Sequence, residues 1–426
     1  MNNSLLFQTR IALCFRIIRY TIVTSVYSYE NLIMEYSVFG CRLNKYYLNQ
    51  WLDYFRSHSF ANQPYLITTC EVTDRAKQKR IKLAKKKLSE WCHLYITWCG
   101  TLKRGEVIST ELFYNLYPEF IPFSDSITLL WEHPDEVSSF TTTKENVYTK
   151  KFVVIQNGCD NYCSFCLTVQ KRGKHTSRSR EEIVQEINEF AQSWGKEIVL
   201  TWVNIAAWWC TNSTKQEESK FTELLTYILD NTTIPRIRIS SLGPEYLDDA
   251  FFKVIENPRI LPHFHLSIQS FSDTVLQRMK RNYTVKILAN VLAKFHALKT
   301  IVPLSLWADI IIGFPGETEE EFKETLHGIQ TYNINKVHPF PFSAHTMWET
   351  VPASVLANQI DQVTKKLREK ELKKIADHVL AQFIELNRNI EHSVLVEWKW
   401  SGWTQNYIKV PVDSKYKRGE IIQIFL

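Results

Sequence analysis

Three cysteines in the middle of the chain have the spacing of an iron–sulfur site. Cys159, Cys163 and Cys166 form a C-x3-C-x2-C pattern that follows a β-like run. Three thiolates on a short loop can hold three irons of a [4Fe–4S] cluster and leave the fourth iron open to a substrate. A structural zinc ion usually takes four ligands in two close pairs, and no second pair stands nearby in the sequence. The spacing favours a cluster, with zinc or chance as the alternative.

Three further cysteines each follow a short β-like run in the first quarter of the chain. These are Cys41, Cys70 and Cys99, and helical patterns over residues 44–56 and 74–88 separate the runs. Strands that alternate with helices predict a parallel sheet, and ligands gather at the carboxyl ends of its strands. We therefore expect these three thiols to converge on one point.

Basic residues follow the cysteine triplet and also crowd one predicted helix. Arg172, Lys174, Arg178 and Arg180 lie just after Cys166. At the rim of a cofactor site such residues would contact RNA phosphates, whereas elsewhere they would form a solvated loop. The helix predicted over residues 74–88 carries eight lysines and arginines, which indicates either a solvated face or a surface that follows phosphates.

The elements that must position the triplet read as a partial barrel. Six β-like runs separated by helical segments cover residues 152–155, 197–201, 236–241, 263–269, 304–312 and 336–342. Six such units with right-handed crossovers predict an open (β/α)6 barrel with its active residues at the carboxyl ends of the strands. A long helix over 358–389 follows, and short strands over 393–397, 404–410 and 421–426 predict a small all-β tail.

Composition restricts the protein class. With 426 residues, 45% hydrophobic and 23% charged, the chain has room for two or three folded domains and is neither disordered nor collagen-like. The net charge of +6 permits an acidic partner such as RNA. Arg10, Arg16 and Arg19 interrupt the apolar N-terminus, unlike a secretory signal. We therefore predict a cytoplasmic protein without membrane association, whose cysteine clusters bind metal.

The combined motifs resemble a known family over residues 34–426. Gly40-Cys41-Arg42-Leu43-Asn44, Thr69-Cys70-Glu71-Val72-Thr73, Cys99 and the triplet are similar to the radical S-adenosylmethionine (radical SAM) methylthiotransferases. The resemblance implies an α/β fold with a Rossmann-like N-terminal domain at 34–140, a radical SAM barrel domain at 145–390 and an all-β TRAM-like RNA-binding domain at 391–426. Residues 1–33 would be an N-terminal extension or a frayed arm.

The resemblance also implies the cofactors. Cys159, Cys163 and Cys166 would hold the radical cluster, and Cys41, Cys70 and Cys99 an auxiliary [4Fe–4S] cluster. S-adenosylmethionine would be cleaved to a radical that removes hydrogen from an unactivated C–H bond, so the cofactor rather than a side chain carries the hard step. By motif position, Phe165, Asn204 and Gln269 are candidate cofactor contacts, with plain barrel packing as their alternative role.

Finer motifs indicate a branch of the family. Residues 200–205, 238–242, 262–266 and 308–317 resemble the branch that acts on N6-threonylcarbamoyladenosine in tRNA. This implies a monomer that modifies C2 of adenosine 37 in the anticodon loop and takes electrons from a donor such as flavodoxin or ferredoxin. The alternatives are isopentenyladenosine-37, a ribosomal-protein aspartate, or an inactive, metal-stabilised RNA-binding protein.

Tryptophans stand where the family expects glycine. The chain has 13 Trp and only 12 Gly, and an indole blocks both a positive φ and a close backbone approach. One hypothesis is that UGA encodes glycine in the gene and was translated as tryptophan; genuine tryptophans would instead favour the inactive alternative. The positions concerned are Trp98, Trp202, one of Trp208 and Trp209, Trp307 and Trp348, with Trp194, Trp398 and Trp400 as further candidates.

Overall fold

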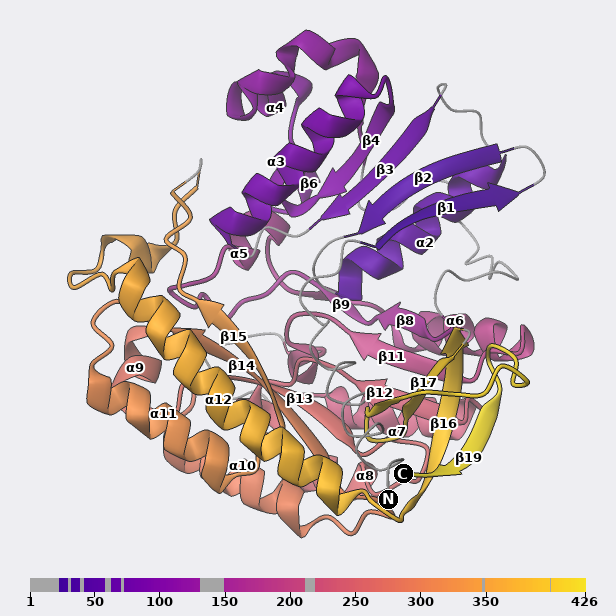
Figure 1. Cartoon of the computed structure of the whole chain (residues 1–426), viewed down its shortest axis with the longest axis vertical. Coiled ribbons are helices and arrows are strands. Elements are labelled where there is room, and N and C mark those ends of the chain that lie inside the picture. Colours follow the sequence, from indigo (N-terminus) through magenta and orange to yellow (C-terminus); the bar gives the residue numbers. More distant parts are fainter. Residues whose placement is uncertain are drawn as a thin grey trace, which may run out of the picture.

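A computed structural model describes three connected parts of the chain (Figure 1). An N-terminal sheet domain lies above a barrel of parallel strands, and a small antiparallel sheet lies beside the barrel. Among the described residues, none of the helices combines the length and apolar character needed to cross a bilayer. The structure describes residues 23–29, 32–38, 42–57, 63–69, 73–130, 149–210, 219–346, 349–398 and 400–426.

The N-terminal domain is a five-stranded sheet in the order β1-β2-β3-β4-β7. Strands β2 to β7 are parallel, and β1 pairs antiparallel at the edge. The strands are β1 (Val23–Tyr29), β2 (Leu32–Val38), β3 (Pro64–Thr69), β4 (His93–Trp98) and β7 (Ile127–Leu129). Strand β1 and the start of β2 fall within residues 1–33, so part of the predicted extension forms an edge of this sheet.

Helices cover both faces of this sheet. Successive side chains of a strand point to opposite faces, so both faces carry apolar residues that a helix can bury. Tyr65 and Ile67 of β3 pack with one cluster that includes Leu88, whereas Leu66 packs with the cluster that contains Trp51. The helices are α2 (Arg42–Ser57), α3 (Asp74–Ser89) and α4 (Thr110–Leu116), with the hairpin β5 (Leu102–Lys103) and β6 (Glu106–Val107) between α3 and α4. The parallel sheet that the sequence predicts is confirmed.

The barrel consists of two three-stranded parallel sheets, in the orders β12-β11-β8 and β13-β14-β15. Isolated parallel bridges from Ile237 to Ile260 and from Leu242 to Leu266 join them. The predicted partial barrel is therefore confirmed. Its strands are β8 (Lys151–Val154), β11 (Glu197–Thr201), β12 (Arg236–Ile239), β13 (His263–Gln269), β14 (Ser305–Ile312) and β15 (Lys336–Pro341).

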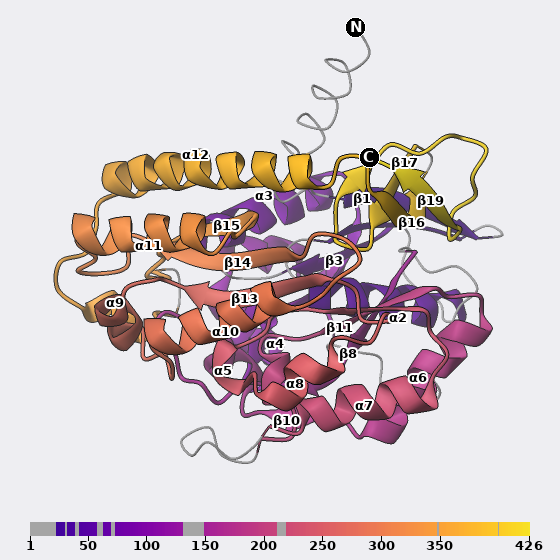
Figure 2. The same cartoon turned by 90° about the horizontal axis from the view of Figure 1, so that it is seen from below.

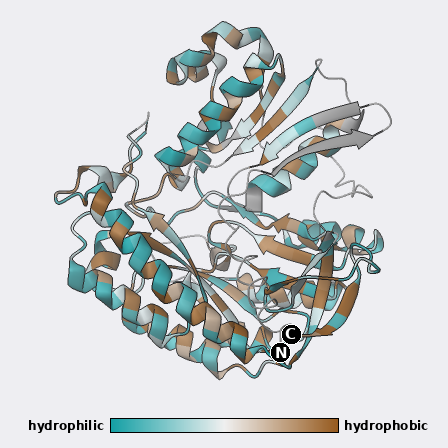
Figure 3. Ribbon diagram, viewed as in Figure 1, coloured by the Kyte–Doolittle hydropathy of each residue, from teal (hydrophilic) through white to brown (hydrophobic). Residues whose placement is uncertain are grey.

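Helices lie outside the barrel strands, as Figure 2 shows for α6, α7, α8 and α10. The helices show mixed hydrophilic and hydrophobic colours, whereas several barrel strands are coloured mainly hydrophobic (Figure 3). The helices are α5 (Thr168–Arg172), α6 (Arg180–Gln192), α7 (Phe221–Asn231), α8 (Asp249–Val254), α9 (Asp273–Arg278), α10 (Val285–Ala297), α11 (Glu319–Thr331) and α12 (Gln362–Leu386).

Polar side chains occupy alternate positions on strands β13 to β15. Phe264, Leu266 and Ile268 pack into the main apolar core, so the residues between them point to the opposite face of the sheet. On that face His265 Nε2 lies 2.9 Å from Asp309 Oδ1. His338 Nδ1 lies 3.4 Å from the same oxygen. One face of these strands therefore packs into the apolar core, and the other carries the polar cluster of His265, Asp309 and His338.

The C-terminal domain is an antiparallel sheet in the order β18-β17-β16-β19. Its strands are β16 (Glu391–Trp398), β17 (Ser401–Thr404), β18 (Lys409–Val410) and β19 (Ile421–Phe425). The single strand predicted over 404–410 is wrong, because a turn with Tyr407 at a φ of 68° divides it. Arg238 anchors this domain by donating to the carbonyls of Thr404 (2.8 Å) and Gln405 (2.9 Å).

Four tryptophans adopt the backbone conformation that favours glycine. Trp91, Trp194, Trp209 and Trp400 have φ values of 61°, 67°, 60° and 77°, and residues with a Cβ are strained there. This supports the glycine hypothesis for Trp194 and Trp400 and selects Trp209 over Trp208. The φ of Trp91 adds a further candidate for a recoded glycine, one that the sequence pattern did not indicate. Trp348 and the side chains of Trp98 and Trp398 lie outside what the structure describes.

Candidate functional site

The cysteine triplet lies in a loop at the carboxyl end of the first barrel strand. The loop follows β8 and the short strand β9 (Gln156–Asn157), which pairs with β10 (Thr176–Ser177). Gly158 has a φ of 69°, and a Cβ at this position would lie 1.8 Å from the carbonyl oxygen of Lys174. The amide of Cys159 donates to Gly173 O at 3.3 Å. Glycine is thus needed for the loop to approach the chain that returns beside it.

The three thiols of the loop are close enough to affect one another. Burial raises the pKa of the Cys159 thiol to about 12, and the neighbouring Cys166 and Cys163 sulfurs contribute to that rise. Arg281 Nη1 donates to Cys163 Sγ at 3.2 Å, and the Thr168 amide donates to Cys166 Sγ at 3.4 Å. The described cysteines form no disulfide.

Three free thiols on one loop, with hydrogen-bond donors to two of the sulfurs, fit a [4Fe–4S] cluster held by three thiolates. A positive charge beside a sulfur favours the thiolate form that binds iron. Arg281 was not among the residues that the sequence selected, because it is 115 positions from Cys166 and only the fold brings it to the loop.

Of the second cysteine group, Cys41, Cys70 and Cys99, the structure describes Cys99. Cys99 is buried at the end of β4 and accepts a hydrogen bond from Arg172 Nη2 at 3.1 Å. Cys41 and Cys70 lie outside the described residues. Thr69 and Trp98 pair in register at the ends of β3 and β4, and Cys70 and Cys99 are the next residues along the chain. The strand order thus agrees with the predicted convergence, and the auxiliary cluster stays a prediction.

A direct contact between two domains brings Cys99 against α5, the helix that follows the triplet loop. Two backbone amides in the turn between β5 and β6 donate hydrogen bonds to carbonyls of α5. Arg104 N donates to Gln170 O at 2.9 Å, and Gly105 N donates to Lys171 O at 2.8 Å. A Cβ at Gly173 would lie 2.7 Å from Arg104 O, so the two backbones are in close contact. Helix α5 begins two residues after Cys166. The N-terminal domain therefore packs on the helix that directly follows the triplet.

A small pocket, partly open to solvent, adjoins the triplet loop. Gln156 and Asn204 are buried in its wall, and Gln156 Nε2 donates to Asn204 O at 2.7 Å. Among the described residues, Gln156 Oε1 and Asn204 Nδ2 have no hydrogen-bond partner. They leave one acceptor and one donor free for a polar ligand. The lining residues are Gln156, Cys159, Asp160, Asn161, His175, Asn204, Ala207, Cys210 and Tyr246.

The three predicted cofactor contacts differ in position. Asn204 lines the pocket, whereas Phe165 packs partly buried against an apolar cluster with Leu167 and Val275. Gln269 is buried at the end of β13, with a φ of 66°. Cofactor contact stays a prediction for all three. The sequence had assigned no role to Cys210, whose place in the pocket is visible only in the structure.

The predicted RNA-contacting residues divide into buried and exposed ones. Arg172 is buried, and Arg178 is largely buried with its Nη1 2.8 Å from Glu186 Oε2, so their positions do not support a phosphate contact. Lys174 and Arg180 are exposed, and Arg180 pairs with Glu181 at 2.8 Å. In the basic helix α3, two further members are buried, and the exposed ones are Arg75, Lys79, Lys82, Lys85 and Lys86.

Trp202 fills space next to the triplet loop. It is buried, its indole nitrogen donates to Gly158 O at 2.7 Å, and the Arg172 guanidinium lies 5.0 Å from its ring centre. The indole therefore packs against the backbone that carries Cys159. Whether this indole crowds a bound cofactor stays a prediction.

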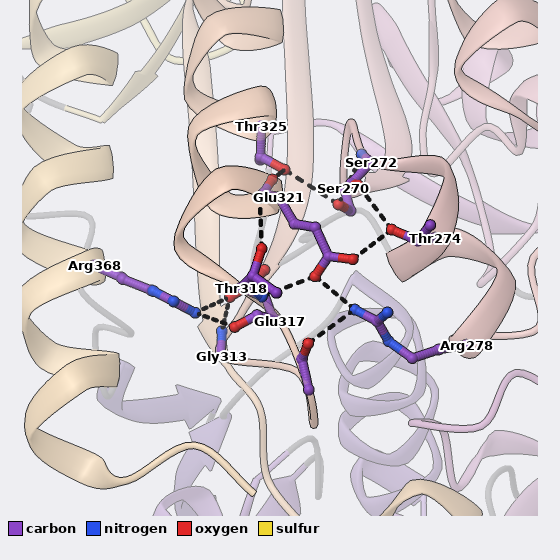
Figure 4. Close-up of polar contacts among 11 residues, drawn as sticks. Ser270, Ser272, Thr274, Arg278, Gly313, Glu317, Thr318, Glu321, Thr325 and Arg368 are labelled. Carbon is purple, nitrogen blue, oxygen red and sulfur yellow. Dashed lines mark hydrogen bonds and ion pairs between the residues drawn. The ribbon is translucent and has the colours of Figure 1, made fainter. Parts of the chain in front are cut away.

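Ion pairs hold the loop that follows β14 at the same end of the barrel (Figure 4). Glu317 accepts from Gly313 N at 2.7 Å and pairs with Arg368 of α12 at 2.7 Å. Glu321 pairs with Arg278 of α9 at 2.7 Å and completes the capping box of α11. These contacts fix the loop between β14 and α11 at the rim of the barrel, and Ser164 of the triplet loop donates to the carbonyl of Arg278 at 2.9 Å.

Comparison with known proteins agrees with this arrangement. Residues 153–329 match the model of the radical SAM superfamily. The Rickettsia prowazekii threonylcarbamoyladenosine tRNA methylthiotransferase MtaB is 30% identical over 92% of this chain and 94% of its own length. The Bacillus subtilis protein of that name is 32% identical over 62% of this chain and 58% of its own. A tRNA-2-methylthio-N(6)-dimethylallyladenosine synthase from Carboxydothermus hydrogenoformans is 27% identical over 84% and 87%.

Proposed function

Because the chain belongs to the family of radical SAM methylthiotransferases, we propose that it adds a methylthio group to N6-threonylcarbamoyladenosine at position 37 of tRNA. The observation that supports this proposal is the domain contact that brings Cys99 against Arg172 of α5, the helix that directly follows the Cys159–Cys166 loop. Transfer of sulfur to a substrate radical requires both sites to open on one cavity.

The chain's own residues would bind and orient the cofactors. Cys159, Cys163 and Cys166 hold the radical cluster, and Arg281 and Thr168 donate hydrogen bonds to its sulfur ligands. When bound, the cluster and S-adenosylmethionine supply the radical chemistry that no side chain can. Cys99, together with Cys41 and Cys70, would hold the auxiliary cluster.

The pocket beside the loop would give S-adenosylmethionine two polar contacts. The unpaired Asn204 amide nitrogen and Gln156 carbonyl oxygen can each make one hydrogen bond to S-adenosylmethionine. Both side chains are buried, so these bonds would form away from bulk water, where an unmet partner is costly. We infer that they orient the cofactor against the open iron.

The tRNA would approach from the exposed basic surfaces. The exposed lysines and arginines of α3, with Lys174 and Arg180, provide positive charge on the N-terminal domain and on the segment after α5. Adenosine 37 lies in a loop, and RNA loops can present unstacked bases to a protein pocket. The electron donor would be a small carrier such as flavodoxin or ferredoxin, and the enzyme would act as a monomer.

The decisive experiment is mass analysis of tRNA nucleosides from cells that have or lack the gene. We expect the 2-methylthio form of threonylcarbamoyladenosine to disappear without the gene. The intact gene should restore it, whereas a gene encoding Cys163→Ala should not. Loss of the methylthio dimethylallyl nucleoside instead would assign the other substrate, which the similarity to a synthase of that nucleoside keeps open. No change in any methylthio nucleoside would refute action on tRNA.

A test on the isolated protein separates the enzyme from an inactive RNA-binding protein. After anaerobic reconstitution we expect iron and sulfide for two clusters and formation of 5′-deoxyadenosine from S-adenosylmethionine. A protein that binds tRNA but forms no deoxyadenosine would support the inactive alternative, which gains weight if Trp202 is genuine.

A further inference from the structure

One arginine of the radical SAM domain contacts a cysteine of the other domain. Arg172 is the last residue of α5, six positions after Cys166. Its side chain is buried, and its Nη2 lies 3.1 Å from Cys99 Sγ. The residue therefore connects the segment after the triplet to the second cysteine group.

The backbone around Arg172 is fixed on both sides. The carbonyls of Gln170 and Lys171 accept hydrogen bonds from Arg104 and Gly105 of the N-terminal domain. Gly173 ends the helix by donating to Val169 O at 3.0 Å and has no room for a Cβ. The Lys171 ammonium pairs with Glu349 at 2.6 Å. The guanidinium is therefore held against the sulfur by the domain contact itself.

We propose that Arg172 is a positioning residue that sets the reduction potential of the auxiliary cluster by placing a positive charge on the sulfur of Cys99. This inference rests on the proposed function, because it takes Cys99 to be a cluster ligand. A reduced cluster carries one more negative charge than an oxidised one. A cation that donates to a ligand sulfur therefore stabilises the reduced form more and raises the potential.

Arginine suits this role better than lysine. The guanidinium stays charged at any physiological pH and presents a planar set of donors, so it can reach a sulfur and a neighbouring aromatic ring together. Arg172 does both, since its guanidinium also lies 5.0 Å from the centre of the Trp202 ring. Arg281 makes the same kind of bond to Cys163 Sγ, at 3.2 Å. Each cysteine group thus has an arginine on one of its sulfurs.

The test isolates the auxiliary cluster in the full-length chain. Cys159, Cys163 and Cys166 are replaced by alanine, the protein is reconstituted anaerobically, and the midpoint potential is measured by an EPR-monitored redox titration. Arg172→Gln should lower the reduced-to-oxidised ratio at a fixed potential at least tenfold, which is 59 mV for a one-electron couple. Arg172→Lys should shift it less.

Arg104→Gln is the matched control. It removes an equal charge from an exposed side chain at the same domain contact, so the potential should stay unchanged. Loss of iron from Arg172→Gln, with retention in Arg172→Lys, also supports the proposal, because charge then decides whether Cys99 holds iron.

Other outcomes overturn it. A full iron content with an unshifted potential in Arg172→Gln refutes the role of Arg172 alone. Equal loss of iron from the glutamine and lysine variants refutes an electrostatic role, because packing would then explain it. No cluster in the parent protein with Arg172 intact would refute the auxiliary cluster itself, and with it the proposed function.

Discussion

The turn that follows helix α3 contains a tryptophan, Trp91, whose backbone conformation should destabilise the protein. Trp91 N donates to Leu88 O and Cys92 N donates to Lys87 O, each at 3.1 Å, with Trp91 at a φ of 61°. This is the Schellman arrangement, in which glycine usually occupies the left-handed position. The indole is 88% exposed, so it contributes little burial in return. We predict that Trp91→Gly stabilises the protein.

The size of the effect follows from two opposing quantities. The left-handed conformation costs a residue with a Cβ about 1–2 kcal/mol. Glycine is freer in the unfolded chain, which offsets about 0.5–1 kcal/mol of that gain. The net stabilisation should be about 0.5–1 kcal/mol. Trp194 follows α6 with the same pattern of hydrogen bonds, at a φ of 67° and 84% exposure, and Trp194→Gly should have a similar effect.

The assay is chemical denaturation followed by circular dichroism, with Trp91→Ala as the matched control. Alanine removes the indole but keeps the Cβ, so it should give none of the gain. A glycine variant no more stable than the alanine variant would refute the reasoning about φ. The gene offers an independent check, since UGG codons at Trp91, Trp194, Trp209 and Trp400 would contradict the glycine hypothesis.

Two further predictions concern the barrel. Burial opposes ionisation of Glu197, but the charges of Arg238 and Arg236 outweigh it and lower its pKa to about 2. A lowered pKa stabilises the fold above the unfolded value near 4.5, and this contribution is lost as pH falls from about 4.5 to 2. Denaturation at several pH values should show that slope, and Glu197→Gln should flatten it while costing about 3–5 kcal/mol at neutral pH; an unchanged slope would contradict the buried pairing. Gly158→Ala places a Cβ 1.8 Å from Lys174 O and should displace the cysteine loop, so reconstituted protein should lose iron from the radical cluster. Gly419→Ala is its control, because a Cβ there meets nothing within 4 Å; equal iron contents would show that the loop tolerates the Cβ.

Local patterns in the sequence were sufficient for the order and type of most elements. Strands β11 and β13 have the predicted bounds, because apolar runs with clear ends specify buried strands. The prediction failed at residues 404–410, where a turn at Tyr407 separates β17 from β18. The hydrogen bonds around a turn residue stabilise its φ angle. The pattern of apolar and polar side chains did not indicate the positive φ of Tyr407.

The sequence by itself determined the cysteine triplet, the parallel domains and the family, because spacing along one loop and the alternation of apolar residues are local properties. Only the tertiary structure decided which partners those residues meet. Arg172 reads as a surface cation in the sequence, yet the fold buries it against Cys99, and Arg281 reaches Cys163 from far along the chain. Contacts between residues distant in sequence depend on how the domains pack. The surroundings of a charged side chain are therefore set by tertiary packing, and the neighbouring residues in the chain do not predict them.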